Sequence, residues 1–153
     1  MRSRRYHKPW LALFVATALA GCSHTPSYSM TAGTLPPVPH GDARVFLYRG
    51  LEPYESTAFI PAYLNDEAAG FTQNGAVLYR DVPAGRYTIS VVSHGRIPSR
   101  SASVTVVAGQ LVYARIETLS DFDPIFPDET FSVVIDDPNK GNREIQALSL
   151  IPG

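Results

Sequence analysis

Cys22 is the residue whose neighbours most clearly indicate a chemical fate. It is the only cysteine in a chain of 153 residues, so no intramolecular disulfide can form. It follows Leu19, Ala20 and Gly21 at the end of a short apolar run that itself follows a basic N-terminus. A basic start, a short apolar run and small residues are the pattern of a secretory signal peptide and its cleavage site. We therefore predict export, cleavage after Gly21, and a new N-terminus at Cys22.

The same four residues resemble a bacterial lipobox, in which leucine and two small residues precede a cysteine. The resemblance implies a thioether-linked diacylglycerol on Cys22, with Leu19, Ala20 and Gly21 recognised by the signal peptidase. It also implies acylation of the new amino terminus. Ser23 implies transfer to the outer membrane, facing the periplasm, by the sorting rule of enteric-type bacteria. The alternative is a plain signal peptide with an incidental cysteine. A permanent transmembrane helix is less favoured, because spanning helices need about 20 apolar residues.

The four histidines do not indicate a catalytic site. His7 lies in the segment expected to be removed, His24 and His40 lie in a proline-rich stretch, and His94 lies in a glycine-containing loop. No Gly-x-Ser-x-Gly sequence marks a nucleophile elbow. Zinc is disfavoured because the chain has no paired cysteine and its histidines lack metal-ligand spacing. We therefore expect no enzyme activity, no catalytic residue, no metal and no cofactor.

Acidic residues gather in two late loops, and this raises the alternative of a calcium site. The residues concerned are Asp121, Asp123, Asp128, Glu129, Asp136 and Asp137. Carboxylate oxygens are the ligands that calcium prefers. The stretch that begins at Asp137 starts like a calcium loop, but its glycine comes one place early and its twelfth position is Leu148. We expect solvated acidic turns, with calcium binding and a weak hydrolytic activity of these loops as the alternatives.

The predicted mature chain is acidic. The whole sequence has 13 basic and 14 acidic side chains. Removing residues 1–21 takes away four basic residues and no acidic one, which leaves a net charge of −5 with histidine neutral. Nucleic-acid binding needs clustered lysine and arginine to contact phosphates. Nucleic acid is therefore excluded as the expected partner.

The chain divides into three parts by composition: a signal peptide at 1–21, a Ser/Thr/Pro-rich tether at 22–41, and one domain at 42–153. In the domain, short β-branched and aromatic runs alternate with turn residues, which is typical of an all-β sandwich. We predict an antiparallel β-sandwich of seven to nine strands. The expected strands are Ala43–Arg49, Ile60–Asn65, Ala68–Thr72, Ala76–Val82, Arg86–Ser93, Ala102–Val107, Leu111–Leu119, Phe131–Ile135 and Glu144–Ile151.

A turn in the middle of the domain carries a family resemblance. Tyr79 to Ile89 places a strand, a Val-Pro-Ala-Gly-Arg-Tyr turn and an alternating strand in succession. This pattern is similar to transthyretin-like and PEGA-like β-sandwich modules. With Ala43–Arg49 and Val107–Tyr113 it resembles small bacterial envelope lipoproteins of unknown function. The resemblance covers about 43–119 and implies the sandwich fold, but it brings no catalytic residue.

Aromatic side chains suggest a surface that could touch a partner. Both faces of the expected first strand are apolar, with Val45 and Leu47 on one face and Phe46 and Tyr48 on the other. One interpretation is a contact surface for an envelope protein or a cell-wall glycan. Its candidate residues are Phe46, Tyr48, Tyr54, Tyr113, Phe122 and Phe126. The favoured alternative is that the tether, or the 120–130 loop, covers this face.

From these observations we expect a lipid-anchored protein of the bacterial envelope that acts as a non-enzymatic binding or scaffolding module. One alternative is an accessory or weakly hydrolytic enzyme that uses the acidic loops. Another is a purely structural envelope spacer.

Overall fold

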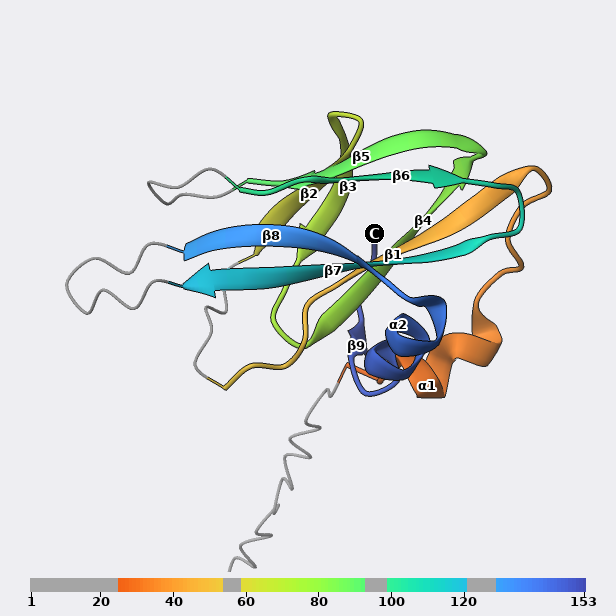
Figure 1. Cartoon of the computed structure of the whole chain (residues 1–153). Coiled ribbons are helices and arrows are strands. Elements are labelled where there is room, and N and C mark those ends of the chain that lie inside the picture. Colours follow the sequence, from red (N-terminus) through yellow and green to blue (C-terminus); the bar gives the residue numbers. More distant parts are fainter. Residues whose placement is uncertain (1–24, 54–58, 93–98, 121–128) are drawn as a thin grey trace, which may run out of the picture.

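The fold is a sandwich of two β-sheets with a small helical layer on one outer side (Figure 1). A computed structural model describes residues 25–53, 59–92, 99–120 and 129–153. The predicted β-sandwich is confirmed, with nine strands in the described residues. Cys22 with Leu19, Ala20 and Gly21, the loop around His94, and the acidic loop at 121–128 lie outside the described residues.

The first sheet, sheet A, has five strands in the order β8-β7-β1-β4-β9. Their bounds are Glu129–Asp136 (β8), Leu111–Ser120 (β7), Asp42–Tyr48 (β1), Ala76–Pro83 (β4) and Ser149–Leu150 (β9). Strand β1 is central, antiparallel to β4 and parallel to β7. Strand β9 also pairs parallel with β4. The sandwich is therefore mainly antiparallel, with two parallel pairs that the sequence pattern did not indicate.

The second sheet, sheet B, has four antiparallel strands in the order β3-β2-β5-β6. Their bounds are Glu67–Thr72 (β3), Ile60–Leu64 (β2), Gly85–Val91 (β5) and Ala102–Val106 (β6). Strands β2 and β3 form a hairpin, and its turn lies at Asn65 and Asp66, which both have positive φ. Asparagine and aspartate tolerate that conformation better than other residues with a side chain.

Apolar side chains form two separate cores because β1 is apolar on both faces. One core lies between the sheets, where Val45 and Leu47 of β1 meet Ile89 and Val91 of β5. The other lies on the outer face of sheet A, where Phe46, Tyr48 and Tyr113 are buried under other segments. The outer face of sheet A is therefore buried within the protein and is not exposed to solvent.

One of these covering segments comes from the stretch predicted to be an extended tether. Tyr28–Thr31 forms a short helix, α1, and Ala32–Thr34 continues as a 3₁₀ turn, η1. Tyr28 donates its backbone N–H to the Leu148 carbonyl at 2.7 Å, and its ring packs edge-on against Phe46 at 5.5 Å. The prediction of an extended tether is therefore wrong for residues 28–34, because Tyr28 gains a buried aromatic site by folding back.

The second covering segment replaces the strand predicted at Glu144–Ile151. The structure has a helix, α2, at Pro138–Ile145, and only Ser149–Leu150 is a strand. Asp137 caps this helix by accepting from the backbone N–H of Asn139 at 2.9 Å, and Pro138 occupies its first turn. Both residue types favour a helix start at those positions. Residues 138–142, which precede the strand predicted at Glu144–Ile151, are therefore the first part of a helix.

Candidate functional site

The aromatic surface predicted from the sequence is buried. The exposed fractions of Phe46, Tyr48 and Tyr113 are 1%, 0% and 3%. Phe46 stacks on Tyr113 with 5.2 Å between ring centroids and 13° between ring planes. A contact surface needs exposed side chains, so that interpretation is wrong for these three residues. The favoured alternative, a covered face, is the one the structure shows, with Tyr28 of the 22–41 segment among the covering residues. Tyr54, Phe122 and Phe126 lie outside the described residues.

An ion pair closes one end of this buried aromatic row. Arg44 donates from Nε and Nη2 to the two carboxylate oxygens of Asp81, at 2.7 and 2.8 Å. Its guanidinium also lies 4.3 Å from the centroid of the Tyr79 ring. The bidentate hydrogen bond with Asp81 raises the pKa of Arg44. Paired and stacked in this way, Arg44 holds β1 to β4 beneath the helical layer.

A second charged cluster closes the other end, between β7, β8 and α2. Asp136 accepts from Arg115 Nε at 2.7 Å, from Lys140 Nζ at 2.8 Å and from the Tyr48 hydroxyl at 2.5 Å. Burial alone would raise the pKa of Asp136, but these hydrogen bonds outweigh it and lower the pKa to about 2. Asp136 is therefore ionised at neutral pH and joins the helix to the sheet.

The groups around Asp136 are engaged with one another. The Tyr48 hydroxyl also lies 2.9 Å from Glu144, and Arg115 also contacts Glu117. Burial and then its two carboxylate neighbours raise the pKa of Tyr48. A phenol with a raised pKa is a poor general base at neutral pH. This arrangement is suited to fixing α2 in place, and we assign it a structural role.

The outer face of sheet B has a different character. Phe71 of β3 pairs with Pro61 of β2, and the Val92 N–H donates to the Pro61 carbonyl from the end of β5. Directly opposed residues project on the same face of a sheet, so these three side chains form a row across three strands. Phe59 lies directly before β2, two residues from Pro61, and is adjacent in sequence to this row. We call Phe59, Pro61, Phe71 and Val92 the sheet B patch.

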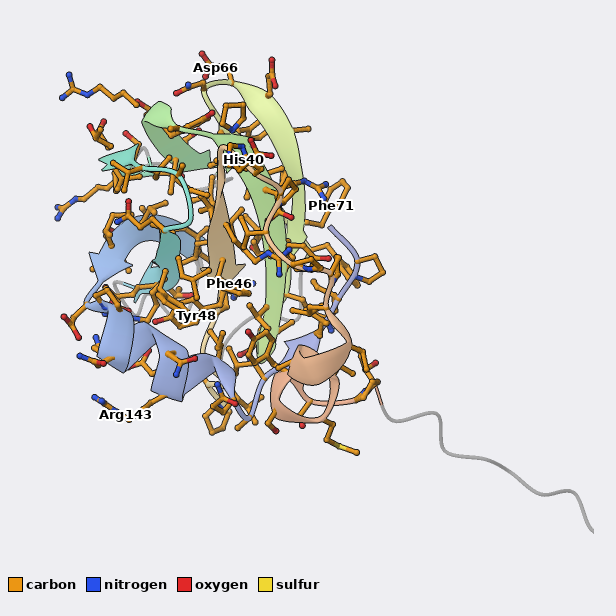
Figure 2. The ribbon with its side chains drawn as sticks, turned by 90° about the vertical axis from the view of Figure 1, so that its right-hand side faces the viewer. His40, Phe46, Tyr48, Asp66, Phe71 and Arg143 are labelled. Carbon is orange, nitrogen blue, oxygen red and sulfur yellow. The ribbon has the colours of Figure 1, made fainter. Side chains whose placement is uncertain are left out.

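The sheet B patch is open to solvent. Phe59 and Phe71 are 64% and 58% exposed, and Val92 is also exposed. Figure 2 shows Phe71 at the rim of the molecule, away from Phe46 and Tyr48 in the interior. Exposed apolar residues that gather on one face mark interaction sites more often than scattered ones do. The sheet B patch is therefore the best candidate contact surface among the described residues.

A recess of about 550 Å³ lies beside β7. Four consecutive residues of β7, Arg115 to Thr118, line it together with Glu52 and Glu144. Strand β1 ends at Tyr48, opposite Arg115 of β7, so the recess lies beside the part of β7 that extends past the end of β1. Its one arginine is already held by Asp136 and Glu117. The recess offers carboxylates but no unengaged cation from its described lining.

Calcium binding and a membrane-spanning helix were the alternatives that the sequence left open. They contain no group of three or more His, Cys, Asp or Glu side chains that could hold a metal ion. The acidic residues Asp121, Asp123 and Asp128 lie outside the described range, so the calcium alternative stays a prediction. No helix within the described ranges is long and apolar enough to cross a membrane.

Sequence reasoning did not single out the sheet B patch, although a signal was present. In β2, Ile60, Ala62 and Leu64 point into the core. The alternating residues Phe59, Pro61 and Tyr63 are also apolar or aromatic. A strand with two apolar faces needs either a cover or a partner, and the 59–64 segment shows the same pattern as the first strand.

The family described as "Protein of unknown function (DUF2846)" matches residues 39–127. This match covers more than half of the chain. The chain belongs to this family. The DUF2846 match includes all of sheet B and strands β1, β4 and β7 of sheet A. The helices that cover sheet A, α1 and α2, lie outside it, as do strands β8 and β9 of sheet A. Neither the curated proteins nor the solved structures contained a match to this chain.

Proposed function

We propose that this chain is a lipid-anchored protein of the bacterial envelope that acts as a non-enzymatic binding module and contacts its partner through the sheet B patch. The observation that carries the proposal is the contrast between the two outer sheet faces. Helices and the N-terminal segment cover sheet A, whereas Phe59 and Phe71 remain exposed on sheet B. Exposed aromatic side chains commonly supply the main contacts of a protein interface.

The anchor is the second part of the proposal. The sequence Leu19-Ala20-Gly21-Cys22 and the basic, apolar segment before it support lipidation of Cys22 and export. Ser23 favours the outer membrane with the domain facing the periplasm. Two or more acyl chains give stable membrane attachment, whereas one chain alone is marginal. The intact mass of the protein purified from membranes, with its N-terminal peptide mapped, tests this part directly.

The third part of the proposal concerns the group of β-sandwich modules to which the domain is related. The turn from Pro83 to Gly85 joins β4 to β5, and Tyr87 donates its hydroxyl to the Pro83 carbonyl at 3.0 Å. This tyrosine-closed turn supports the resemblance to transthyretin-like and PEGA-like modules. We propose that the DUF2846 domain is a member of that broader group of sandwiches.

An envelope protein is the partner that suits the sheet B patch best. The patch joins two phenylalanines to a proline and a valine across adjacent strands. An apolar surface of this composition is matched by apolar side chains, whereas glycan recognition also needs polar groups placed to bind hydroxyls. The exposed edge strand β3 borders the patch and could add main-chain hydrogen bonds to a protein partner.

Affinity isolation from crosslinked cells tests the contact. The wild-type protein should recover a reproducible envelope protein, and the double variant Phe59→Ser/Phe71→Ser should lose it. Val107→Ser is the matched control, because Val107 is 62% exposed but lies in the turn between β6 and β7. Equal recovery by all three proteins would contradict the assigned surface. Recovery of glycan alone would replace the protein partner by a cell-wall polymer.

If the protein is purely a structural spacer, the opposite result is expected for the surface variants. A spacer depends on its length and anchor, so its cellular role should be insensitive to Phe59→Ser/Phe71→Ser and sensitive to loss of the Cys22 thiol. The hydrolytic alternative depends on Asp121, Asp123 and Asp128. Their replacement by alanine would lower turnover with folding intact only if that alternative were correct.

A further inference from the structure

The described chain is fixed to the domain almost immediately after Cys22. The Leu150 N–H donates to the Pro26 carbonyl at 3.2 Å, and Ser27 forms an antiparallel bridge with Ser149. Tyr28 then enters the buried core on sheet A. The chain is therefore held in place from Pro26 onward. Only four residue steps separate Pro26 from the cysteine that the proposed function lipidates.

This short link limits how far the domain can stand from a membrane. Four fully extended residues span at most about 14 Å. A domain of this length has a radius of gyration of about 14 Å, so the link is shorter than the domain is wide. A lipidated Cys22 would keep the surface around Pro26 at the level of the lipid headgroups. The domain could pivot about this point, but it could not move away from the membrane.

The surface around Pro26 belongs to the helical layer. Figure 1 shows α1, α2 and β9 together on one side of the molecule, with β5 and β6 of sheet B on the opposite side. Met30 of α1 is 76% exposed and lies only four residues beyond Pro26. Arg143 is exposed on the outer side of α2 (Figure 2). An apolar side chain and a nearby cation suit the boundary between acyl chains and phosphates.

The contact expected here is apolar rather than electrostatic. Residues 25–35 carry no charged side chain, and Lys140 of α2 is held by Asp136. A basic cluster that would select anionic lipids is therefore missing from the described part of this surface. Exposed Met30 would sit in the interface by burying apolar area, with little dependence on salt.

We infer that the helical layer lies flat on the membrane, with Met30 in the interface and sheet B directed away from the lipid. This inference rests on the proposed lipid anchor. It gives the contrast between the sheets a functional meaning: the covered side of the sandwich faces lipid, and the strands β5 and β6 face the aqueous compartment.

A tryptophan scan tests the orientation. Trp10 is the only tryptophan, and it lies in the segment expected to be cleaved, so the mature protein should contain none. The variants Met30→Trp and Arg86→Trp are produced with the native leader, purified from membranes and reconstituted in phosphatidylcholine vesicles. Arg86 is exposed on β5 of sheet B and serves as the control. Phospholipids brominated near the glycerol backbone quench tryptophan that lies in the interface.

The expected result is several-fold stronger quenching for Met30→Trp than for Arg86→Trp, unchanged by added salt. Arg143→Trp on α2 should also be quenched more than Arg86→Trp, and it provides a second position on the same surface. Equal quenching at all positions, or stronger quenching at Arg86→Trp, in protein whose mass shows the lipid would overturn the orientation and leave the proposed function standing. Protein from membranes without lipid on Cys22 would overturn both.

Discussion

The outer faces of the two sheets carry similar side chains, but one face is covered by other segments and the other is exposed to solvent. Both carry aromatic and aliphatic residues: Phe46, Tyr48 and Tyr113 on sheet A, and Phe59 and Phe71 on sheet B. On sheet A, α1 and α2 cover these residues and make a second core. On sheet B the residues stay exposed. An apolar pattern on a strand therefore predicts that the face will be covered, but whether by the same chain or by a partner depends on distant segments.

The distribution of charge sharpens this contrast. Partly buried ion pairs close both ends of the row on sheet A, Arg44 with Asp81 and Arg115 with Asp136. Such pairs fix geometry, because a mispaired arrangement would leave a charge buried. The sheet B patch combines two phenylalanines with Pro61 and Val92 and contains no charged residue. The outer face of sheet A is thus fixed against helices of the same chain, whereas the sheet B patch is suited to contact with another molecule.

The largest predicted effect is on the covered face. Phe46→Ala removes a ring that packs against Tyr28, Tyr79 and Tyr113 and leaves a cavity. Truncation of a buried phenylalanine costs about 3–5 kcal/mol. Phe71→Ala should change the free energy of unfolding by less than about 0.5 kcal/mol, as expected for an exposed site. Urea denaturation of both variants measures the difference, and comparable losses would contradict the contrast between the faces.

The next effect concerns the carboxylate that holds α2. The pKa of Asp136 is lowered to about 2 from the 3.8 of an unperturbed aspartate, so its contribution is present above about pH 4 and lost as the pH falls toward about 2. This shift corresponds to about 2 kcal/mol of stability at neutral pH. Asp136→Asn should remove that amount.

The pH dependence of unfolding separates this charge effect from a general loss of packing. The difference in unfolding free energy between wild type and Asp136→Asn should shrink between about pH 4 and about pH 2. Asp66→Asn is the control, because Asp66 lies in the exposed turn between β2 and β3. A difference that stays constant over this range would contradict the assigned role of the Asp136 carboxylate.

A third effect on the free energy of unfolding is predicted where α2 contacts sheet A. A Cβ on Gly141 would overlap the Cβ and Cγ atoms of Tyr113. Gly141→Ala should therefore displace α2 and cost about 1–3 kcal/mol, although alanine is the better helix former by about 1 kcal/mol. Gly33→Ala is the matched control, since no described atom lies within 4 Å of the added Cβ. Thermal unfolding of the two variants compares them, and a stabilised Gly141→Ala would disprove the close contact.

The sequence indicated the sandwich and several of its strands because those signals are local. Alternation along 86–93 and 111–119, and the Asn74–Gly75 turn, belong to neighbouring residues. The two apolar faces of β1 also indicated that something covers Phe46. The expected cover by the 22–41 segment is correct for Tyr28, whereas the cover by Ile145 of α2 was not predicted, because that stretch was expected to be a strand.

The helix α2 escaped prediction for a physical reason. Pro138, Asn139, Gly141 and Asn142 are typical turn residues, and glycine is unfavourable inside a helix by about 1 kcal/mol. Gly141 is present because the helix approaches Tyr113 too closely for a side chain. That need is set by tertiary packing and leaves no trace in the local sequence. The sheet B patch was missed similarly, since exposure of Phe71 depends on which elements fold back.

Photocrosslinking in living cells tests the central claim most directly. A photoreactive phenylalanine analogue placed at Phe71, on the open face, should give one discrete protein adduct. The same analogue at Val107, which is similarly exposed, should give none. An adduct at Val107 with none at Phe71 would contradict the account, because the partner would then be bound away from the uncovered face of sheet B.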